Sequence, residues 1–127
     1  MGNGTSIGRV RGLGSAKAGP HHWLQQRYTA IGNLLLGLWF AISILLMPNL
    51  SYGAVTEWIG SPVPATAMAL LIISTIWHAR LGLQVLFEDY VHEDGSKFAV
   101  IAILNLVTFA AAAFGLFCVI RLALGGA

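Results

Sequence analysis

The 127-residue sequence is strongly apolar and weakly charged: 57% of its residues are hydrophobic, 9% are charged, and the formal net charge is +2. Its mean hydropathy of +0.76 is far above that of soluble domains, so the composition predicts an integral membrane protein without room for a separate soluble catalytic domain. The single cysteine, Cys118, excludes an internal disulfide and an iron–sulfur cluster held by the cysteines of this chain alone.

Residues 1–27 form a basic arm that we expect at the inner face of the membrane. They contain Arg9, Arg11, Lys17 and Arg27 and no acidic residue. No apolar stretch of a secretory signal is present in the arm, so we expect it to be retained. Basic residues directly before an apolar helix follow the positive-inside rule. This explanation is favoured over nucleic acid binding, and no nucleic acid partner is expected.

Three apolar stretches follow the arm, each long enough for the roughly 20 residues that a spanning helix needs. The sequence is uncharged over 28–56, 58–79 and 98–120, which predicts transmembrane helices at about 28–47, 64–87 and 98–124. The expected fold class is therefore all-α, with residues 28–127 forming one three-helix membrane domain. Arginine and lysine precede the first helix and are absent from 48–64, so the amino terminus is expected inside and the carboxyl terminus outside.

The two connections between these helices carry different signals. In the outer connection, Val55, Trp58 and Ile59 have the i, i+3, i+4 spacing of an apolar helical face, which predicts a short interfacial helix. The inner connection, 88–97, holds four of the five acidic residues of the chain. Its segment 94–96, Asp-Gly-Ser, offers a turn and an N-cap for the third helix.

His78 is the exceptional residue of the second apolar stretch, because a titratable side chain inside a membrane is costly and usually functional. Ser74, His78 and Gly82 have i, i+4, i+8 spacing, so they share one helix face, and Asp89 lies about 20° away around the axis and about 16 Å further along it. Small residues one turn before and one turn after a histidine leave a slot for a flat macrocycle, which suggests haem. The same spacing equally fits close packing of a neighbouring helix, with His78 hydrogen-bonding across the interface.

The remaining histidines bear on how His78 could bind haem. His21, His22 and His92 all fall near the inner surface, where none can face His78 at mid-membrane. A haem with two histidine ligands would therefore take its second ligand from another polypeptide. This predicts that the chain is a subunit of a larger assembly.

Asp89 and Tyr90 fall where the second helix meets the inner interface. A solvated helix end and an interfacial aromatic residue explain them without any ligand. A tyrosine hydroxyl beside a carboxylate also suits quinone reduction, because the phenol donates a hydrogen bond to a carbonyl oxygen as charge develops there. The carboxylate can orient that donor or relay protons.

Arg80 is the one cation near His78 on the second helix. It lies about 200° from His78 around the axis and so points away from the predicted haem slot. We interpret it as a residue that snorkels to the inner surface or pairs with an acid of a partner chain.

Four segments carry a resemblance to a known family. They are Ser15-Ala-Lys17, His22-Trp-Leu-Gln-Gln-Arg-Tyr-Thr-Ala-Ile31, His78-Ala-Arg-Leu-Gly82 and Glu88-Asp-Tyr-Val-His92. They resemble the hydrophobic membrane anchor of succinate dehydrogenase (respiratory complex II), the smaller of its two cytochrome b556 subunits. The specific part is a histidine followed eleven and twelve residues later by Asp-Tyr, whereas the third helix matches only in being apolar.

The resemblance implies roles for individual residues. In that family the anchor has three helices, and the two anchor subunits together hold one haem b and help form a ubiquinone site close to the iron–sulfur subunit. His78 would be one axial ligand of the haem iron, and the partner anchor would supply the other. Tyr90 would hydrogen-bond the quinone, Asp89 would support its protonation, and Arg27 would lie near a haem propionate. Arg27 also fits a snorkelling residue of the positive-inside rule.

The favoured function is a membrane anchor subunit of succinate dehydrogenase, in electron transfer from succinate to ubiquinone. Its partners would be the second anchor, an iron–sulfur subunit and a flavoprotein subunit, which carry the iron–sulfur clusters and flavin, and no active site for succinate is expected on this chain alone. The alternatives are a haem-bearing anchor of another quinone-linked complex, such as fumarate reductase, and a structural or assembly membrane protein in which His78 only packs. No transit peptide is recognisable, which favours a bacterial inner (cytoplasmic) membrane over the mitochondrial inner membrane.

Overall fold

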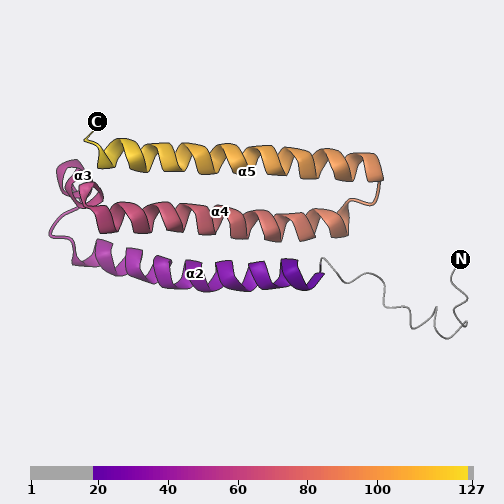
Figure 1. Cartoon of the computed structure of the whole chain (residues 1–127), viewed down its shortest axis with the longest axis horizontal. Coiled ribbons are helices and arrows are strands. Elements are labelled where there is room, and N and C mark those ends of the chain that lie inside the picture. Colours follow the sequence, from indigo (N-terminus) through magenta and orange to yellow (C-terminus); the bar gives the residue numbers. More distant parts are fainter. Residues whose placement is uncertain (1–18, 126–127) are drawn as a thin grey trace, which may run out of the picture.

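The computed structural model describes residues 19–125, which fold into helices joined by short connections (Figure 1). Three long helices, α2 (Gly19–Leu46), α4 (Pro62–Tyr90) and α5 (Asp94–Ala123), alternate in direction, and a short helix, α3 (Tyr52–Gly60), lies between α2 and α4. The three long helices are long and apolar enough to cross a membrane. The all-α prediction with three candidate spans is confirmed. Residues 1–18 of the predicted arm lie outside the described residues, and the orientation of the termini stays a prediction.

The helices extend beyond the limits expected from charge. α2 begins at Gly19 instead of near residue 28, so residues 19–27 of the predicted arm are helical. The expected start was placed after the last cation, but helical backbone hydrogen bonds continue through polar residues, and Pro20 stands in the first turn, where a missing N–H is tolerated. α4 continues through Tyr90 instead of ending near 87.

The start of α5 differs from the expected one in its cap. α5 begins at Asp94 instead of near 98, and its N-cap is Glu93, so the cap expected within 94–96 is wrong by at least one residue. The Glu93 side chain makes no capping bond to the backbone but accepts a hydrogen bond from Ser96 Oγ at 2.7 Å. The acidic Asp94 in the first turn complements the positive end of the helix dipole.

The three long helices form a single layer with α4 in the middle. α2 and α5 lie on opposite sides of α4, and within the described residues they do not contact each other (Figure 1). As a result, the described part of the chain buries just four hydrophobic residues: Ile59, Leu81, Leu104 and Val119. Many large apolar side chains of the three long helices are exposed, so the fold suits a protein surrounded by lipid and by partner helices.

Glycines allow α4 to approach each of its neighbours closely. A Cβ atom added to Gly32 of α2 would lie 3.0 Å from Ser74 Oγ of α4, and one added to Gly115 of α5 would lie 2.9 Å from Ile72 Cγ2 of α4. Small residues at helix contacts are typical of membrane proteins, where packing holds helices together without a hydrophobic driving force.

α3 covers one end of the layer. Its N-cap, Ser51, accepts a hydrogen bond from the Ala54 backbone N–H at 3.3 Å. Trp58 stacks on Trp39 of α2 with ring centroids 5.5 Å apart, and Ile59 is buried. The short helix predicted in this connection is confirmed, and the two aromatic rings tie it to α2.

Candidate functional site

The candidate residues fall into two groups along α4. Ser74, His78 and Gly82 lie at the contact between α2 and α4, here called the α2–α4 seam, whereas Asp89 and Tyr90 stand at the end of α4. We call that end of the layer, where α2 also begins, the Tyr90 end, and the opposite one the α3 end. His78 and Tyr90 are twelve residues apart on α4, about 18 Å along the axis.

The hydroxyl of Thr29 connects α2 to His78. Thr29 Oγ1 lies 2.9 Å from His78 Nδ1, 2.9 Å from the Gln25 carbonyl oxygen and 3.2 Å from the Gln26 carbonyl oxygen. A threonine hydroxyl has one hydrogen, so it can donate either to a backbone carbonyl oxygen of α2 or to His78 Nδ1; when it donates to the backbone, it accepts from an N–H at Nδ1.

The direction of this hydrogen bond corresponds to one tautomer of His78. When Thr29 donates to the backbone, Nδ1 carries the hydrogen, so in the neutral ring Nε2 carries the lone pair. Within residues 19–125, Nε2 makes no hydrogen bond. In metal-binding histidines, the ring nitrogen that does not bind the metal usually donates a hydrogen bond to a neighbouring group, which orients the ring. The half-buried imidazole is therefore arranged so that Nε2 can bind a metal.

The small residues beside His78 pack against α2. Ser74 Oγ donates to the Thr29 carbonyl oxygen at 3.2 Å, and Gly32 stands directly opposite Ser74. A Cβ atom on Gly82 would lie 3.6 Å from Gln26 Nε2. These contacts correspond to the helix-packing alternative for the i, i+4, i+8 pattern, and the role of Ser74 and Gly82 in a haem pocket stays a prediction.

Sequence reasoning missed the α2 side of this seam. Gln26, Thr29 and Asn33 have i, i+3, i+7 spacing, and Asn33 Oδ1 accepts a hydrogen bond from Thr75 Oγ1 at 3.3 Å. Polar residues on one face of an apolar helix are a signal for a helix contact in a membrane. The spacing of Gln26, Thr29 and Asn33 in the sequence carries that signal.

A groove of about 610 Å³ opens between α2 and α4 on the Tyr90 side of His78. It is lined by Gly19, His22, Trp23, Gln26, Gly82, Gln84, Val85 and Glu88. Two of its polar atoms, His22 Nε2 and Gln26 Oε1, are buried and have no hydrogen-bond partner. Buried polar atoms almost always have a partner, so this groove, which begins one turn from His78, fits the polar part of a ligand or ordered water.

Arg27 lies beside this groove without lining it. Its guanidinium group stands over the Trp23 ring, 5.2 Å from the centroid, and the side chain is exposed. Trp23 itself lines the groove. The structure thus places the predicted propionate-binding cation next to the groove, where its charge is free to face a neighbouring group.

Asp89 and Tyr90 are exposed at the end of α4. Tyr90 is 77% exposed, and in the described part of the chain neither side chain makes a hydrogen bond. The adjacent Glu88 differs, because its Oε1 accepts a hydrogen bond from Gln84 Nε2 at 2.9 Å. The tyrosine hydroxyl and the Asp89 carboxylate are therefore available to a ligand, but another chain would have to enclose it.

No metal site is complete within residues 19–125. The described residues include no group of three or more His, Cys, Asp or Glu side chains that could hold a metal ion. A metal bound through His78 would therefore need its other ligands from outside this part of the chain.

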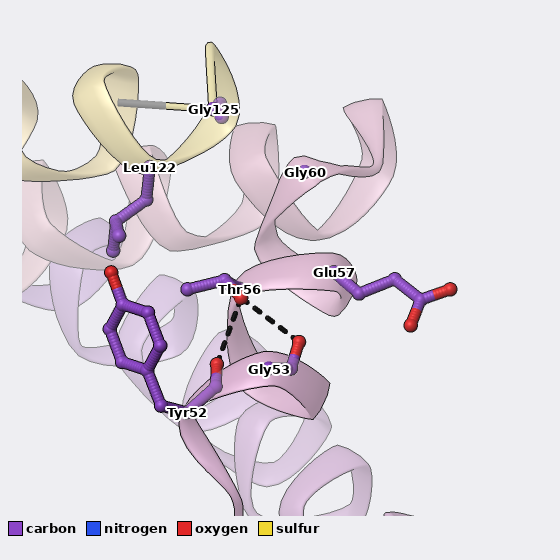
Figure 2. A pocket seen from close by; sticks show the side chains of 8 residues that line it. Tyr52, Gly53, Thr56, Glu57, Gly60, Leu122 and Gly125 are labelled. Carbon is purple, nitrogen blue, oxygen red and sulfur yellow. Dashed lines mark hydrogen bonds between the residues drawn. The ribbon is translucent and has the colours of Figure 1, made fainter. Parts of the chain in front are cut away.

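A different hollow lies at the α3 end, between α3 and the end of α5 (Figure 2). Thr56 Oγ1 donates to the backbone oxygens of Tyr52 and Gly53, and the Glu57 side chain extends away from Leu122, as Figure 2 shows. The hydroxyl of Thr56 is therefore used within α3. None of the candidate residues lines this hollow.

Comparison with known proteins gives a consistent result. A family model described as succinate dehydrogenase/fumarate reductase transmembrane subunit matches residues 1–112. The succinate dehydrogenase hydrophobic membrane anchor subunit of Rickettsia bellii is 33% identical over 114 residues, covering 85% of this chain and 91% of the relative. The subunit of the same name from Paracoccus denitrificans is 28% identical over 116 residues, which cover 91% of this chain and 89% of the relative. The succinate dehydrogenase membrane anchor subunit of Reclinomonas americana is 30% identical over 95 residues, which cover 72% of this chain and 78% of the relative.

Proposed function

The chain belongs to the succinate dehydrogenase/fumarate reductase transmembrane subunit family, as a membrane anchor of the succinate dehydrogenase type, and we propose that it shares one haem b with a second anchor subunit and contributes to a ubiquinone-reduction site. Electrons from the oxidation of succinate in a flavoprotein subunit would reach the quinone through the clusters of an iron–sulfur subunit. This chain would supply residues on the membrane side of that route.

The hydrogen bond between Thr29 and His78 is the observation that carries the haem part of the proposal. With Nδ1 donating to Thr29, the lone pair of Nε2 would remain for the iron, and His78 would be an axial ligand. His21 and His22 lie seven or more residues before Thr29 on α2, and His92 follows α4, so the second ligand would come from the partner anchor. When bound, haem b supplies a one-electron carrier between the two anchors.

The groove between α2 and α4, on the Tyr90 side of His78, would accommodate the polar edge of the haem, which carries the propionates. His22 Nε2 and Gln26 Oε1 lack partners there; a propionate would accept from an N–H at His22 Nε2, and a water bound to it would donate to Gln26 Oε1. Arg27, beside the groove, would add a positive charge near the same propionate.

Tyr90 and Asp89 support the quinone part of the proposal. The Tyr90 hydroxyl would donate a hydrogen bond to one carbonyl oxygen of the quinone, which gains negative charge during reduction. Asp89 would deliver protons from the aqueous side. Both side chains are exposed, so the rest of the pocket would belong to the partner anchor and the iron–sulfur subunit.

We propose that the complex lies in the cytoplasmic membrane of a bacterium, with the Tyr90 end facing the cytoplasm. Basic residues precede α2, and Lys97 stands in the first turn of α5 at the same end, in agreement with the positive-inside rule. The relatives from Rickettsia and Paracoccus support a bacterial membrane.

A structural role without haem is the second candidate function. It is favoured by the packing of Ser74 and Gly82 against α2, which gives both residues a purpose without a ligand. The two functions are separated by purifying the chain with its bound proteins in mild detergent and recording a dithionite-reduced spectrum. A flavoprotein, an iron–sulfur protein and a low-spin b-type haem support the proposed function, whereas a haem-free sample that lacks these proteins overturns it.

A further inference from the structure

A further polar contact inside the layer joins α4 to α5, on the side of α4 away from His78. Arg80 Nε donates a hydrogen bond to Asn105 Oδ1 at 2.6 Å, and the guanidinium group stands over the Trp77 ring, 5.3 Å from its centroid. Neither partner carries a negative charge. From this contact and the groove around it, we propose that a transmembrane helix of a different polypeptide docks here and places a carboxylate on Arg80.

Arg80 lies deep along its helix. It is ten residues before Tyr90 on α4, about 15 Å along the axis, and Asn105 is eleven residues after Asp94 on α5, about 16 Å. Both residues therefore share one level, about 15 Å from the Tyr90 end, a distance equal to half of a 30 Å hydrocarbon core. A cation at this depth is costly unless an anion neutralises it.

The described part of the chain supplies no such anion. Of the five N–H groups of the guanidinium, the one on Nε is used by Asn105, and no described acceptor takes the other four. The acidic residues of the chain lie in α3 or at the Tyr90 end, as the sequence positions Glu57, Glu88, Asp89, Glu93 and Asp94 show. None stands near the level of Arg80.

The groove beside Arg80 is lined by residues that suit close packing of a helix. It measures about 410 Å³ and is lined by Ile73, Ile76, Trp77, Arg80, Asn105, Thr108, Phe109 and Ala112. Thr108 and Ala112 are small and one turn apart on α5, while Phe109 is 78% exposed beside them. The Thr108 hydroxyl donates to backbone oxygens of its own helix, so the residue presents a small apolar surface. Small residues flanked by an aromatic one allow close helix approach in a membrane.

The positive charge of Arg80 and its depth in the membrane indicate what kind of partner binds in this groove. A second copy of this chain has no carboxylate on its long helices except at their Tyr90 ends, so it could not neutralise Arg80. A lipid phosphate stays at the headgroup level, about 15 Å from Arg80 along the helix. A spanning helix of another subunit, with Asp or Glu at the same level, meets both requirements.

The docking surface is separate from the proposed haem ligand. Arg80 lies about 200° from His78 around α4, and it contacts α5, whereas His78 contacts α2. A chain without haem could still bind a partner helix at Arg80, so the two proposals fail independently.

Photo-crosslinking in the assembled complex tests this surface. Phe109 is replaced by p-benzoylphenylalanine, with the same replacement of Phe114 as the control, because Phe114 is exposed about 140° away around α5. After irradiation of intact membranes, we expect Phe109→p-benzoylphenylalanine to label a transmembrane segment of another subunit that contains Asp or Glu, and Phe114 not to label that segment. Labelling of a second copy, of lipid alone, or of a segment without a carboxylate overturns the proposal.

A charge exchange provides an independent measurement on the same surface. Arg80→Glu should lower the amount of the labelled subunit that co-purifies by on the order of tenfold. When the Asp or Glu of that subunit is replaced by arginine in the same complex, the amount that co-purifies should return. Lys97→Gln, which removes a cation at the start of α5, serves as the matched control and should leave co-purification unchanged. Equal retention of the partner by Arg80→Glu and Lys97→Gln contradicts the ion pair.

Discussion

Thr29 Oγ1 and His78 Nδ1 lie 2.9 Å apart across the α2–α4 seam. When the Thr29 hydroxyl gives its hydrogen to the backbone of α2, the histidine donates from Nδ1 and Nε2 keeps its lone pair. One side chain of α2 therefore contacts and orients an imidazole ring on the neighbouring helix. Under the proposed function, the same contact would also support a haem ligand.

Replacing Thr29 by valine should weaken haem binding. Valine keeps the shape of threonine but cannot accept from Nδ1, so the ring loses its orientation, and loss of such a supporting hydrogen bond reduces metal affinity by about 10-fold to 100-fold. The measurement is the ratio of haem to flavin in the purified complex. Thr29→Ser keeps the hydroxyl and should retain haem. A wild-type ratio in Thr29→Val would show that the hydrogen bond does not support the ligand.

His78→Ala should abolish the low-spin b-type spectrum, because the proposed axial ligand is removed. His92→Ala is the matched control, since His92 is exposed at the Tyr90 end and makes no hydrogen bond among the described residues. Reduced-minus-oxidised spectra of both variants provide the comparison. An unaltered haem spectrum in His78→Ala would show that this residue is not a ligand of the iron.

Tyr90→Phe should slow succinate-dependent quinone reduction by about a hundredfold, as expected for loss of one hydrogen bond that strengthens in the transition state. The haem spectrum should stay intact, because Tyr90 is about 18 Å along α4 from His78. Tyr52→Phe, at the α3 end and 66% exposed, controls for loss of a tyrosine hydroxyl elsewhere. If both variants reduce quinone at the wild-type rate, Tyr90 has no part in the reaction.

Gly115→Ala should destabilise the contact between α4 and α5. The added Cβ would lie 2.9 Å from Ile72 Cγ2, and crowding of this kind costs about 1–3 kcal/mol. Gly37→Ala is the matched control, since no atom lies within 4 Å of a Cβ added there. Unfolding of each variant in increasing dodecyl sulfate, followed by circular dichroism, reports the difference. Equal unfolding midpoints for Gly115→Ala and Gly37→Ala would show that the contact between α4 and α5 accommodates the added methyl group.

The helices could be predicted from the sequence because apolar stretches of sufficient length have one stable form in a bilayer. Their ends were less predictable, since charge marks where the membrane ends and not where the helix ends. α2 continues from Tyr28 back to Gly19 for this reason. The helix α3 could be predicted because the i, i+3, i+4 spacing of its apolar residues is a property of this segment alone and does not depend on the helices around it.

The candidate residues were identifiable one helix at a time. His78 was conspicuous as a titratable group in an apolar stretch, and Asp89 and Tyr90 as a pair at its end. The Thr29 contact was not predictable, because it depends on how α2 is rotated and placed against α4, which neither sequence segment specifies alone. The link between Arg80 and Asn105 was hidden in the same way, since 25 positions separate the two residues.

The single-layer arrangement has a consequence for the stability of the chain outside its complex. Among the described residues, α2 and α5 do not contact each other and four hydrophobic side chains are buried, so α4 provides the contacts between the long helices. A partner that binds the folded form raises the stability of such a chain in proportion to the logarithm of its concentration. A copy made in excess of its partners is therefore expected to unfold more readily than one in the complex.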